Sequence, residues 1–83
     1  MEYPWHIYIL RCADDTLYTG VTTDLARRVS EHNESLKGAK YTRVRRPVLL
    51  VYSEAFESRS AACIREAAIK KLSREEKSRL IEG

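Results

Sequence analysis

The sequence contains few cysteines, few glycines and no long hydrophobic run. Its two cysteines, Cys12 and Cys63, lie far apart and form no C-x-x-C pair. They cannot hold together a small secreted fold, so a reduced, cytoplasmic protein is expected. The absence of any run of about 18 apolar residues excludes a membrane-spanning helix. The first five residues have neither the basic region nor the apolar stretch of a signal peptide.

The chain length and composition predict one small folded domain, spanning residues 1–83. Hydrophobic residues make up 43% of the chain, which excludes a disordered protein. A chain of this length buries only about 60% of the surface that its unfolded form exposes, so the core is expected to be small.

Positive charge is in modest excess and is concentrated in one segment. Fifteen Lys and Arg against twelve Asp and Glu give a net charge of +3, and residues 37–46 contain basic but no acidic side chains. Such a run is usually a solvated loop. It indicates a nucleic-acid surface only beside other evidence.

Two adjacent segments predict a β-hairpin. Residues 6–11 and 17–21 are rich in β-branched and aromatic side chains, and residues 13–16 favour a turn. A third strand is expected over residues 48–52, extending as far as residue 55.

The type of turn decides where the two tyrosines of the hairpin point. A two-residue turn would place Tyr8 and Tyr18 on opposite faces of the sheet. A three-residue loop with Asp15 in the left-handed region would set Tyr18 opposite Leu10 and Gly20 opposite Tyr8, so that both tyrosines share a face. We favour this second register because it separates the tyrosines from the aliphatic side chains. The core would then receive Ile7, Ile9, Leu17, Thr19 and Val21.

Three helices are expected. The first runs over residues 24–32 with Thr22 or Thr23 as its cap, and a polar loop containing Gly38 follows. The second runs from residue 58 to 72, and a capping box at residues 73–76 begins a third that ends near residue 81. The buried face of the second is predicted from Ile64, Ala68, Ile69 and Leu72. This order predicts an α+β fold, a small antiparallel sheet flanked by helices.

Three polar side chains on the predicted helices could bind a ligand: Arg28, His32 and Glu66. Arg28 and His32 share a helix face and could both bind a phosphate; the commoner alternative is a solvated arginine and a histidine favoured by the helix dipole. Glu66 lies near the edge of a buried helix face, where it either pairs with Lys70 or binds a cation. Zinc-ligand spacing and glycine-rich phosphate loops are absent.

The order of these residues resembles the GIY-YIG nuclease family, over nearly the whole chain. The residues that carry the resemblance are Ile7-Tyr8, then Tyr18-Thr19-Gly20, Arg28, His32 and Glu66. The segment Lys40-Tyr41-Thr42 is similar to the small stand-alone, single-domain bacterial branch. His6 stands where the first motif has glycine, Thr19 stands where the second has isoleucine, and no asparagine follows Glu66.

The resemblance implies a three-stranded antiparallel sheet and magnesium-dependent cleavage of DNA phosphodiester bonds. It implies catalytic roles for Tyr8, Tyr18, Arg28, His32 and Glu66, with Glu66 as the ligand of Mg²⁺ or Mn²⁺. One deprotonated tyrosine, Tyr8 or Tyr18, would act as the general base, and Arg28 would stabilise charge on the phosphate. His32 would position the water or the base.

The basic side chains are the expected DNA contacts: Arg27, Lys37, Lys40, Arg43, Arg45, Arg46, Lys70 and Lys71. A domain this small has little surface for reading sequence, so specificity is expected from DNA structure or from a targeting protein partner. Two alternatives stay open: a non-catalytic nucleic-acid-binding module with the same fold, and a protein-interaction domain. The intact set of site residues favours the nuclease.

Overall fold

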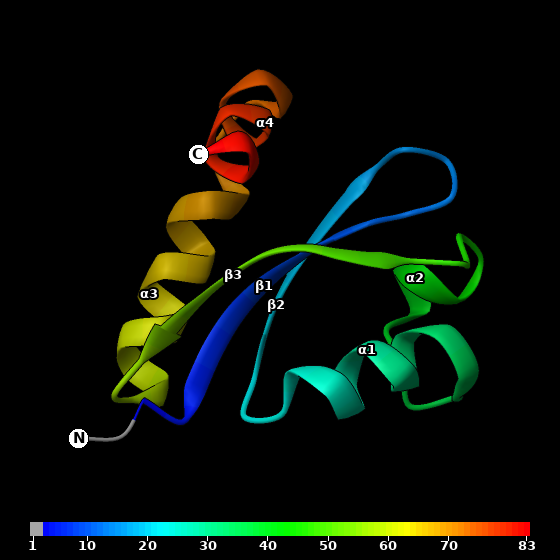
Figure 1. Ribbon diagram of the computed structural model, residues 1–83, viewed down its shortest axis with the longest axis horizontal. Coiled ribbons are helices and arrows are strands. Elements are labelled where there is room, and N and C mark those ends of the chain that lie inside the picture. Colours follow the sequence, from blue (N-terminus) through cyan, green and yellow to red (C-terminus); the bar gives the residue numbers. More distant parts are fainter. Residues whose placement is uncertain (1–2) are drawn as a thin grey trace.

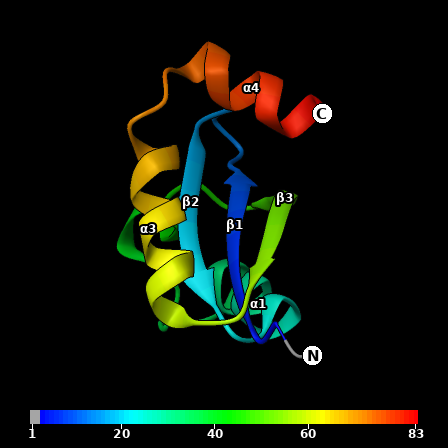
Figure 2. The same cartoon turned by 90° about the vertical axis from the view of Figure 1, so that its left-hand side faces the viewer.

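A three-stranded antiparallel sheet organises residues 3–83, the part of the chain that the computed structural model describes. The central strand β1 (Trp5–Arg11) pairs with β2 (Leu17–Thr22) on one side and with β3 (Leu49–Phe56) on the other. Figure 2 shows β1 between its two neighbours. The α+β fold expected from the sequence, a three-stranded antiparallel sheet flanked by helices, is confirmed.

The β1–β2 hairpin has the register that places both tyrosines on one face. Tyr8 lies opposite Gly20, and Tyr18 lies opposite Leu10. Asp15 has a φ of 68°, in the left-handed region, as the three-residue loop requires. The loop closes through a hydrogen bond in which the backbone N–H of Cys12 donates to the carbonyl of Thr16 at 2.8 Å.

Helices cover both faces of the sheet (Figure 1). The tyrosine face is covered by α1 (Leu25–Glu34), which contributes Leu25 and Val29 to an apolar cluster with Tyr8 and Leu10. The opposite face is covered by α3 (Arg59–Lys70) and α4 (Arg74–Glu82). The sheet therefore separates two small cores, and Tyr8 belongs to one of them.

The second core is aliphatic and lies between the sheet and α3. Its fully buried members are Ile7, Ile9, Ala62 and Ile69, and the partly buried side chains packed against it include Leu17 and Val21. This agrees with the face predicted from the hairpin register. Burying apolar side chains on both faces of one strand lets a short chain form more core than a one-sided sheet would.

The inward face of α3 differs from the predicted one. Ile64 is 70% exposed and Ala68 is exposed, whereas Ala62 and Ile69 are buried and Glu66 between them is half-buried. Alanines occur all round this helix, so the apolar pattern did not identify one face. The buried stripe through Ala62 and Ile69 turns Glu66 toward the sheet.

Two further details of the helices correct the sequence-based expectations. Asp24, and not Thr22 or Thr23, is the N-cap of α1, and its carboxylate accepts a hydrogen bond from the backbone N–H of Arg27 at 3.0 Å. The segment expected as a polar loop contains a short helix, α2 (Lys40–Arg43). The capping box that begins α4 is present as predicted. No helix within residues 3–83 is long and apolar enough to cross a membrane.

Gly20 leaves room for Tyr8, and this contact can be tested. A β-carbon at position 20 would lie 2.4 Å from the hydroxyl oxygen of Tyr8. We expect Gly20→Ala to lower the free energy of unfolding by roughly 1–3 kcal/mol, because the ring of Tyr8 is packed on its other side and must shift. Thermal melts followed by circular dichroism measure the change. Thr23→Ala, at an exposed position just beyond β2, is the control; equal melting temperatures in both variants would contradict the expectation.

Candidate active site

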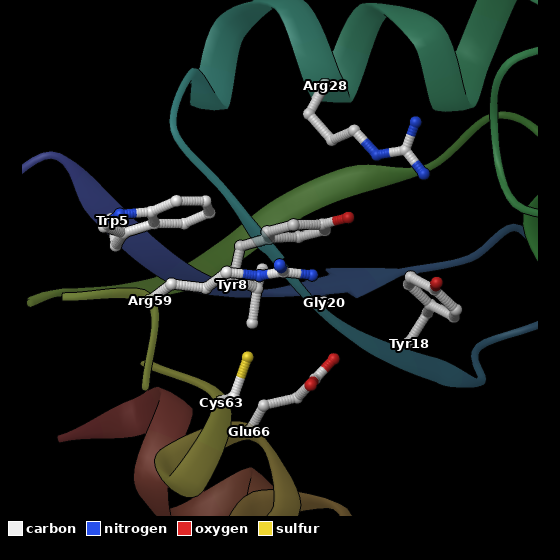
Figure 3. Close-up of a pocket in the computed structure, with 9 residues that line it drawn as sticks. Trp5, Tyr8, Tyr18, Gly20, Arg28, Arg59, Cys63 and Glu66 are labelled. Carbon is white, nitrogen blue, oxygen red and sulfur yellow. The ribbon is translucent and has the colours of Figure 1, made fainter. Parts of the chain in front are cut away.

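A pocket of about 330 Å³ opens beside the edge strand β2, between α1 and α3 (Figure 3). It receives side chains from both faces of the sheet, because Tyr8 and Arg28 come from the α1 side and Glu66 comes from α3. The lining residues are Trp5, Tyr8, Tyr18, Gly20, Val21, Arg28, Arg59, Cys63 and Glu66.

Gly20 allows the two faces to meet at the pocket. The phenol ring of Tyr8 crosses directly over the backbone of Gly20, where any side chain would collide with it. The hydroxyl of Tyr8 thereby reaches the edge of the sheet, although the residue is only 1% exposed. Four of the five residues predicted for the site therefore line one pocket: Tyr8, Tyr18, Arg28 and Glu66.

His32 is the exception, since it lies behind Tyr8 and not in the pocket. Its side chain is fully buried, with Nε2 at 2.7 Å from the hydroxyl oxygen of Tyr8 and Nδ1 at 2.8 Å from the hydroxyl oxygen of Thr42. His32 therefore does not share the pocket with Arg28, and its observed contact is with Tyr8. His32 lies one helical turn beyond Arg28 on α1, and there its side chain points into the core and toward Tyr8.

Burial keeps both partners of this contact neutral. Desolvation raises the pKa of Tyr8 to about 12, although the nearby Arg28 guanidinium lowers it in part. Desolvation, followed by the charge of Arg28, lowers the pKa of His32 to about 4. With a pKa near 12, ionising Tyr8 at pH 7 costs about 7 kcal/mol. The phenol therefore needs an acceptor for its proton, and Nε2 of His32 lies in the right place.

Arg28 is held in place on the α1 side of the pocket. Its Nη1 donates to the carboxylate of Glu31 and to the carbonyl of Lys37, both at 2.9 Å. Desolvation opposes the charge of this half-buried group, but the contacts with Glu31 and Tyr8 outweigh it and raise the pKa of Arg28. A fixed cation at the pocket wall suits an anionic ligand such as a phosphodiester.

Tyr18 belongs to an aromatic group at the other end of the pocket. Its ring stacks on Tyr41 with centroids 5.9 Å apart, and it meets the ring of His32 edge-on at 5.3 Å. The guanidinium of Arg45 lies 3.9 Å above the ring of Tyr41. It also donates a hydrogen bond to the backbone carbonyl of Tyr41. Tyr18 is therefore supported by α2 rather than by the hairpin alone.

Glu66 is the pocket's carboxylate, and it also forms an ion pair. One of its oxygens lies 3.3 Å from Nζ of Lys70, one helical turn along α3. Of the two alternatives that the sequence offered for Glu66, the ion pair with Lys70 is present, and binding of a cation stays a prediction. Within residues 3–83 no group of three His, Cys, Asp or Glu is arranged to hold a metal. Mg²⁺ is commonly held by one or two carboxylates together with water and substrate phosphate oxygens, so a single glutamate fits that pattern.

Four lining residues were not predicted for the site: Trp5, Val21, Arg59 and Cys63. The guanidinium of Arg59 lies 5.9 Å from the centroid of the Trp5 ring, near the outer limit of a cation–π contact. Arg59, Cys63 and Glu66 are spaced at i, i+4 and i+7 on α3, so they share one helix face. Counting back from Glu66 at this helical spacing could have identified Arg59 and Cys63 as pocket residues from the sequence.

The basic residues expected to contact DNA do not form a uniform group. The guanidinium of Arg46 donates to the carbonyls of His32 and Ser35 at 2.6 and 2.5 Å and so closes the C-terminus of α1. Arg45 pairs with Asp14 at 3.0 Å and Lys70 pairs with Glu66. The exposed remainder of the set is Arg27, Lys37, Lys40, Arg43 and Lys71.

Comparison with known proteins gives the family. The family model described as the GIY-YIG catalytic domain matches residues 4–79, and the chain therefore belongs to the GIY-YIG family. Its relatives include small single-domain proteins from archaea as well as bacteria.

Two relatives and two solved structures illustrate the similarity. UPF0213 protein DP2720 of Desulfotalea psychrophila is 59% identical, over 95% of this chain and 72% of the relative. UPF0213 protein NP_0776A of Natronomonas pharaonis is 58% identical, over 92% and 88%. The solution NMR structure of UPF0213 protein BH0048 from Bacillus halodurans is 47% identical with a TM-score of 0.61, covering 94% of this chain and 82% of that one. The NMR structure of EF2693 from E. faecalis is 44% identical with a TM-score of 0.64, covering 99% and 85%.

The burial of His32 predicts a pH-dependent stability. Because the pKa of His32 is lowered to about 4, the unfolded chain binds a proton at pH values where the native protein does not. The contribution of neutral His32 to the free energy of unfolding is therefore present above its pKa of about 6.5 in the unfolded chain, and it is lost as the pH falls toward 4. We expect the free energy of unfolding to fall by about 2 kcal/mol between pH 7 and pH 4.5.

Urea titrations across this range measure the effect. His32→Gln should flatten the dependence, whatever its own stability. His6→Gln removes the chain's other imidazole and leaves the contact between Tyr8 and His32 intact, so it is the matched control. A dependence that survives in His32→Gln and disappears in His6→Gln would show that the buried imidazole is not its source.

Proposed function

We propose that this protein is a metal-dependent endonuclease that hydrolyses phosphodiester bonds in DNA. The supporting observation is the pocket itself, in which a fixed arginine, two tyrosine hydroxyls and a carboxylate from the opposite helix surround one space. Membership of the GIY-YIG family supports the same reaction class. A simple binding surface requires positive charge but no buried tyrosine in contact with a histidine.

In this proposal Tyr8, rather than Tyr18, is the general base. The attacking water gives its proton to the hydroxyl oxygen of Tyr8, while the phenol's own proton passes to Nε2 of His32 at 2.7 Å. This transfer avoids a free phenolate, which costs about 7 kcal/mol at pH 7; protonating His32, whose pKa is lowered to about 4, costs about 4 kcal/mol instead. The negative charge of a bound phosphodiester favours the imidazolium that forms.

The other residues act on the phosphate. Arg28 binds its non-bridging oxygens and stabilises the charge that develops on them. Glu66 would hold the divalent cation, Mg²⁺ or Mn²⁺, whose chemistry is to stabilise the leaving oxygen. Exposed basic side chains on α1 and around α2 lie on the pocket's α1 side and would contact neighbouring phosphates.

A non-catalytic DNA-binding module is the second candidate, and the ion pair between Glu66 and Lys70 favours it. In that reading the carboxylate is a structural partner of Lys70 and holds no cation. An ion pair as exposed as this one contributes only a few tenths of a kcal/mol. The two candidates therefore predict different results when each partner of the pair is changed separately.

The decisive variant is Glu66→Gln, with Lys70→Gln as its matched control. Both break the ion pair, but only the first removes the anionic oxygen that a divalent cation prefers. We expect Glu66→Gln to lose cleavage by at least about 100-fold while DNA affinity and melting temperature change little. Lys70→Gln should retain cleavage. The assay uses single-stranded, duplex, flap and branched DNA with Mg²⁺ or Mn²⁺.

Equal loss in both variants would assign the effect to the ion pair and contradict a metal role for Glu66. Undiminished cleavage in a carefully purified Glu66→Gln sample would show that another carboxylate or a contaminant supplies the activity. Absence of cleavage by the unchanged protein on every substrate, with DNA binding retained, would establish the second candidate.

DNA binding should depend steeply on salt, because contacts with phosphates release counterions. Trp5 is the chain's one tryptophan and lines the pocket, so its fluorescence reports occupancy directly. We expect Arg43→Gln to weaken binding and to reduce the slope of log affinity against log salt by about 1. Arg79→Gln, on α4, is the control. If Arg43→Gln leaves the salt dependence of the affinity unchanged, Arg43 does not contact a DNA phosphate.

A further inference from the structure

In the motif Lys40-Tyr41-Thr42, the threonine has no role in the chemistry described so far, yet it is fully buried and reaches the imidazole that contacts Tyr8. Thr42 is 0% exposed, and its hydroxyl oxygen lies 2.8 Å from Nδ1 of His32. We propose that Thr42 is a positioning residue, which keeps His32 protonated at Nδ1 so that Nε2 is free to accept the proton of Tyr8. The inference rests on the proposed function in one respect: that Nε2 of His32 accepts the proton of Tyr8 during cleavage.

The hydroxyl of Thr42 decides the tautomer because it carries one proton. In the proposed arrangement that proton is donated to the carbonyl of Ala39 at 2.9 Å, and the same carbonyl also accepts from the backbone N–H groups of Thr42 and Arg43. Toward His32 the hydroxyl can then act only as an acceptor, so the close contact of 2.8 Å requires a proton on Nδ1. Nε2 is left unprotonated and accepts from the hydroxyl of Tyr8 at 2.7 Å.

One neighbouring group favours the opposite tautomer. The backbone N–H of Ala39 also points at Nδ1, at 3.4 Å. This contact is much longer than the two that involve Thr42, and hydrogen bonds weaken as they lengthen. With the hydroxyl present, the shorter contacts prevail.

Removal of the hydroxyl should reverse this balance. In Thr42→Val the N–H of Ala39 is the group that remains beside Nδ1, and because it is a donor it selects the tautomer protonated at Nε2. Nε2 then donates to Tyr8 and cannot accept its proton. Water cannot easily replace the lost hydroxyl, because Tyr8, His32 and Thr42 are all buried.

The nitrogen NMR shifts of the imidazole rings measure the tautomer without any need for activity. The protein has only two histidines, so uniformly ¹⁵N-labelled protein gives an assignable pair, and His6→Gln identifies the signals of His32. We expect His32 to be protonated at Nδ1 in the unchanged protein and in Thr42→Ser, which keeps the hydroxyl. We expect Thr42→Val to shift His32 toward Nε2 protonation and to lose cleavage by about 100-fold, while Thr42→Ser retains cleavage.

Protonation of His32 at Nε2 in the unchanged protein would overturn the proposal, as would a Thr42→Val protein that keeps Nδ1 protonated. If Thr42→Val does not fold, as judged by circular dichroism, the unchanged protein and Thr42→Ser still decide the tautomer. If no DNA is cleaved by any sample, the proposed nuclease function fails, whereas the NMR result still confirms or overturns the role of Thr42.

Discussion

The passage of Tyr8 over Gly20 is the constraint on which the site depends. Tyr8 is on the central strand, where a side chain would ordinarily be enclosed by the sheet's neighbours and its covering helix. Only because the partner residue lacks a β-carbon does the phenol extend across β2 to the edge of the sheet. Glu66 approaches the same edge from the opposite face, on α3. A single missing side chain thus joins two faces that the sheet otherwise separates.

The buried polar contacts behind Tyr8 follow from this placement. A phenol enclosed in an apolar cluster needs a hydrogen-bond partner, because an unpaired buried hydroxyl is costly. His32 is that partner, and it in turn is held by Thr42. Among the described residues every buried side-chain nitrogen and oxygen atom has a partner. Satisfied polar networks in a small core specify one arrangement, as the proposed proton transfer from Tyr8 to His32 would require.

The sequence predicted the sheet, the hairpin register and the order of the larger helices well, because each of these depends on local signals. The turn around Asp15 determines the register, and the register determines that Tyr8 faces Gly20. The burial of Thr42 against His32 was missed because this contact joins two separate segments of the chain. Thr42 is ten residues from His32 in a segment too short for helical periodicity, so nothing in the pattern indicated that it is buried against the imidazole.

The inward face of α3 was mispredicted because contacts with the sheet, and not the local pattern, decide it. Alanines around α3 left its apolar pattern ambiguous, and the packing of Ala62 and Ile69 on the sheet decided its rotation. Arg46 belongs to a basic run that reads as a nucleic-acid surface. Its guanidinium also satisfies carbonyls at the end of α1, and one of these, that of His32, lies fourteen residues earlier in the chain. Charge counted along a sequence cannot separate cations that bind a ligand from cations that complete the fold.

The formal charges of the pocket fit a reaction in which negative charge grows. Arg28 and Arg59 carry two positive charges and Glu66 carries one negative charge, which leaves one net positive charge to meet a phosphodiester. In the proposed reaction, attack by water places further negative charge on the phosphate oxygens, and Arg28 is already held at the pocket wall by Glu31 and Lys37. A group held in position before the reaction loses no orientational freedom at the transition state. If the proposed reaction holds, the anchoring of Arg28 by Glu31 and Lys37 serves the chemistry as well as the fold, since it directs a permanent charge at the pocket while Tyr8 and His32 are neutral.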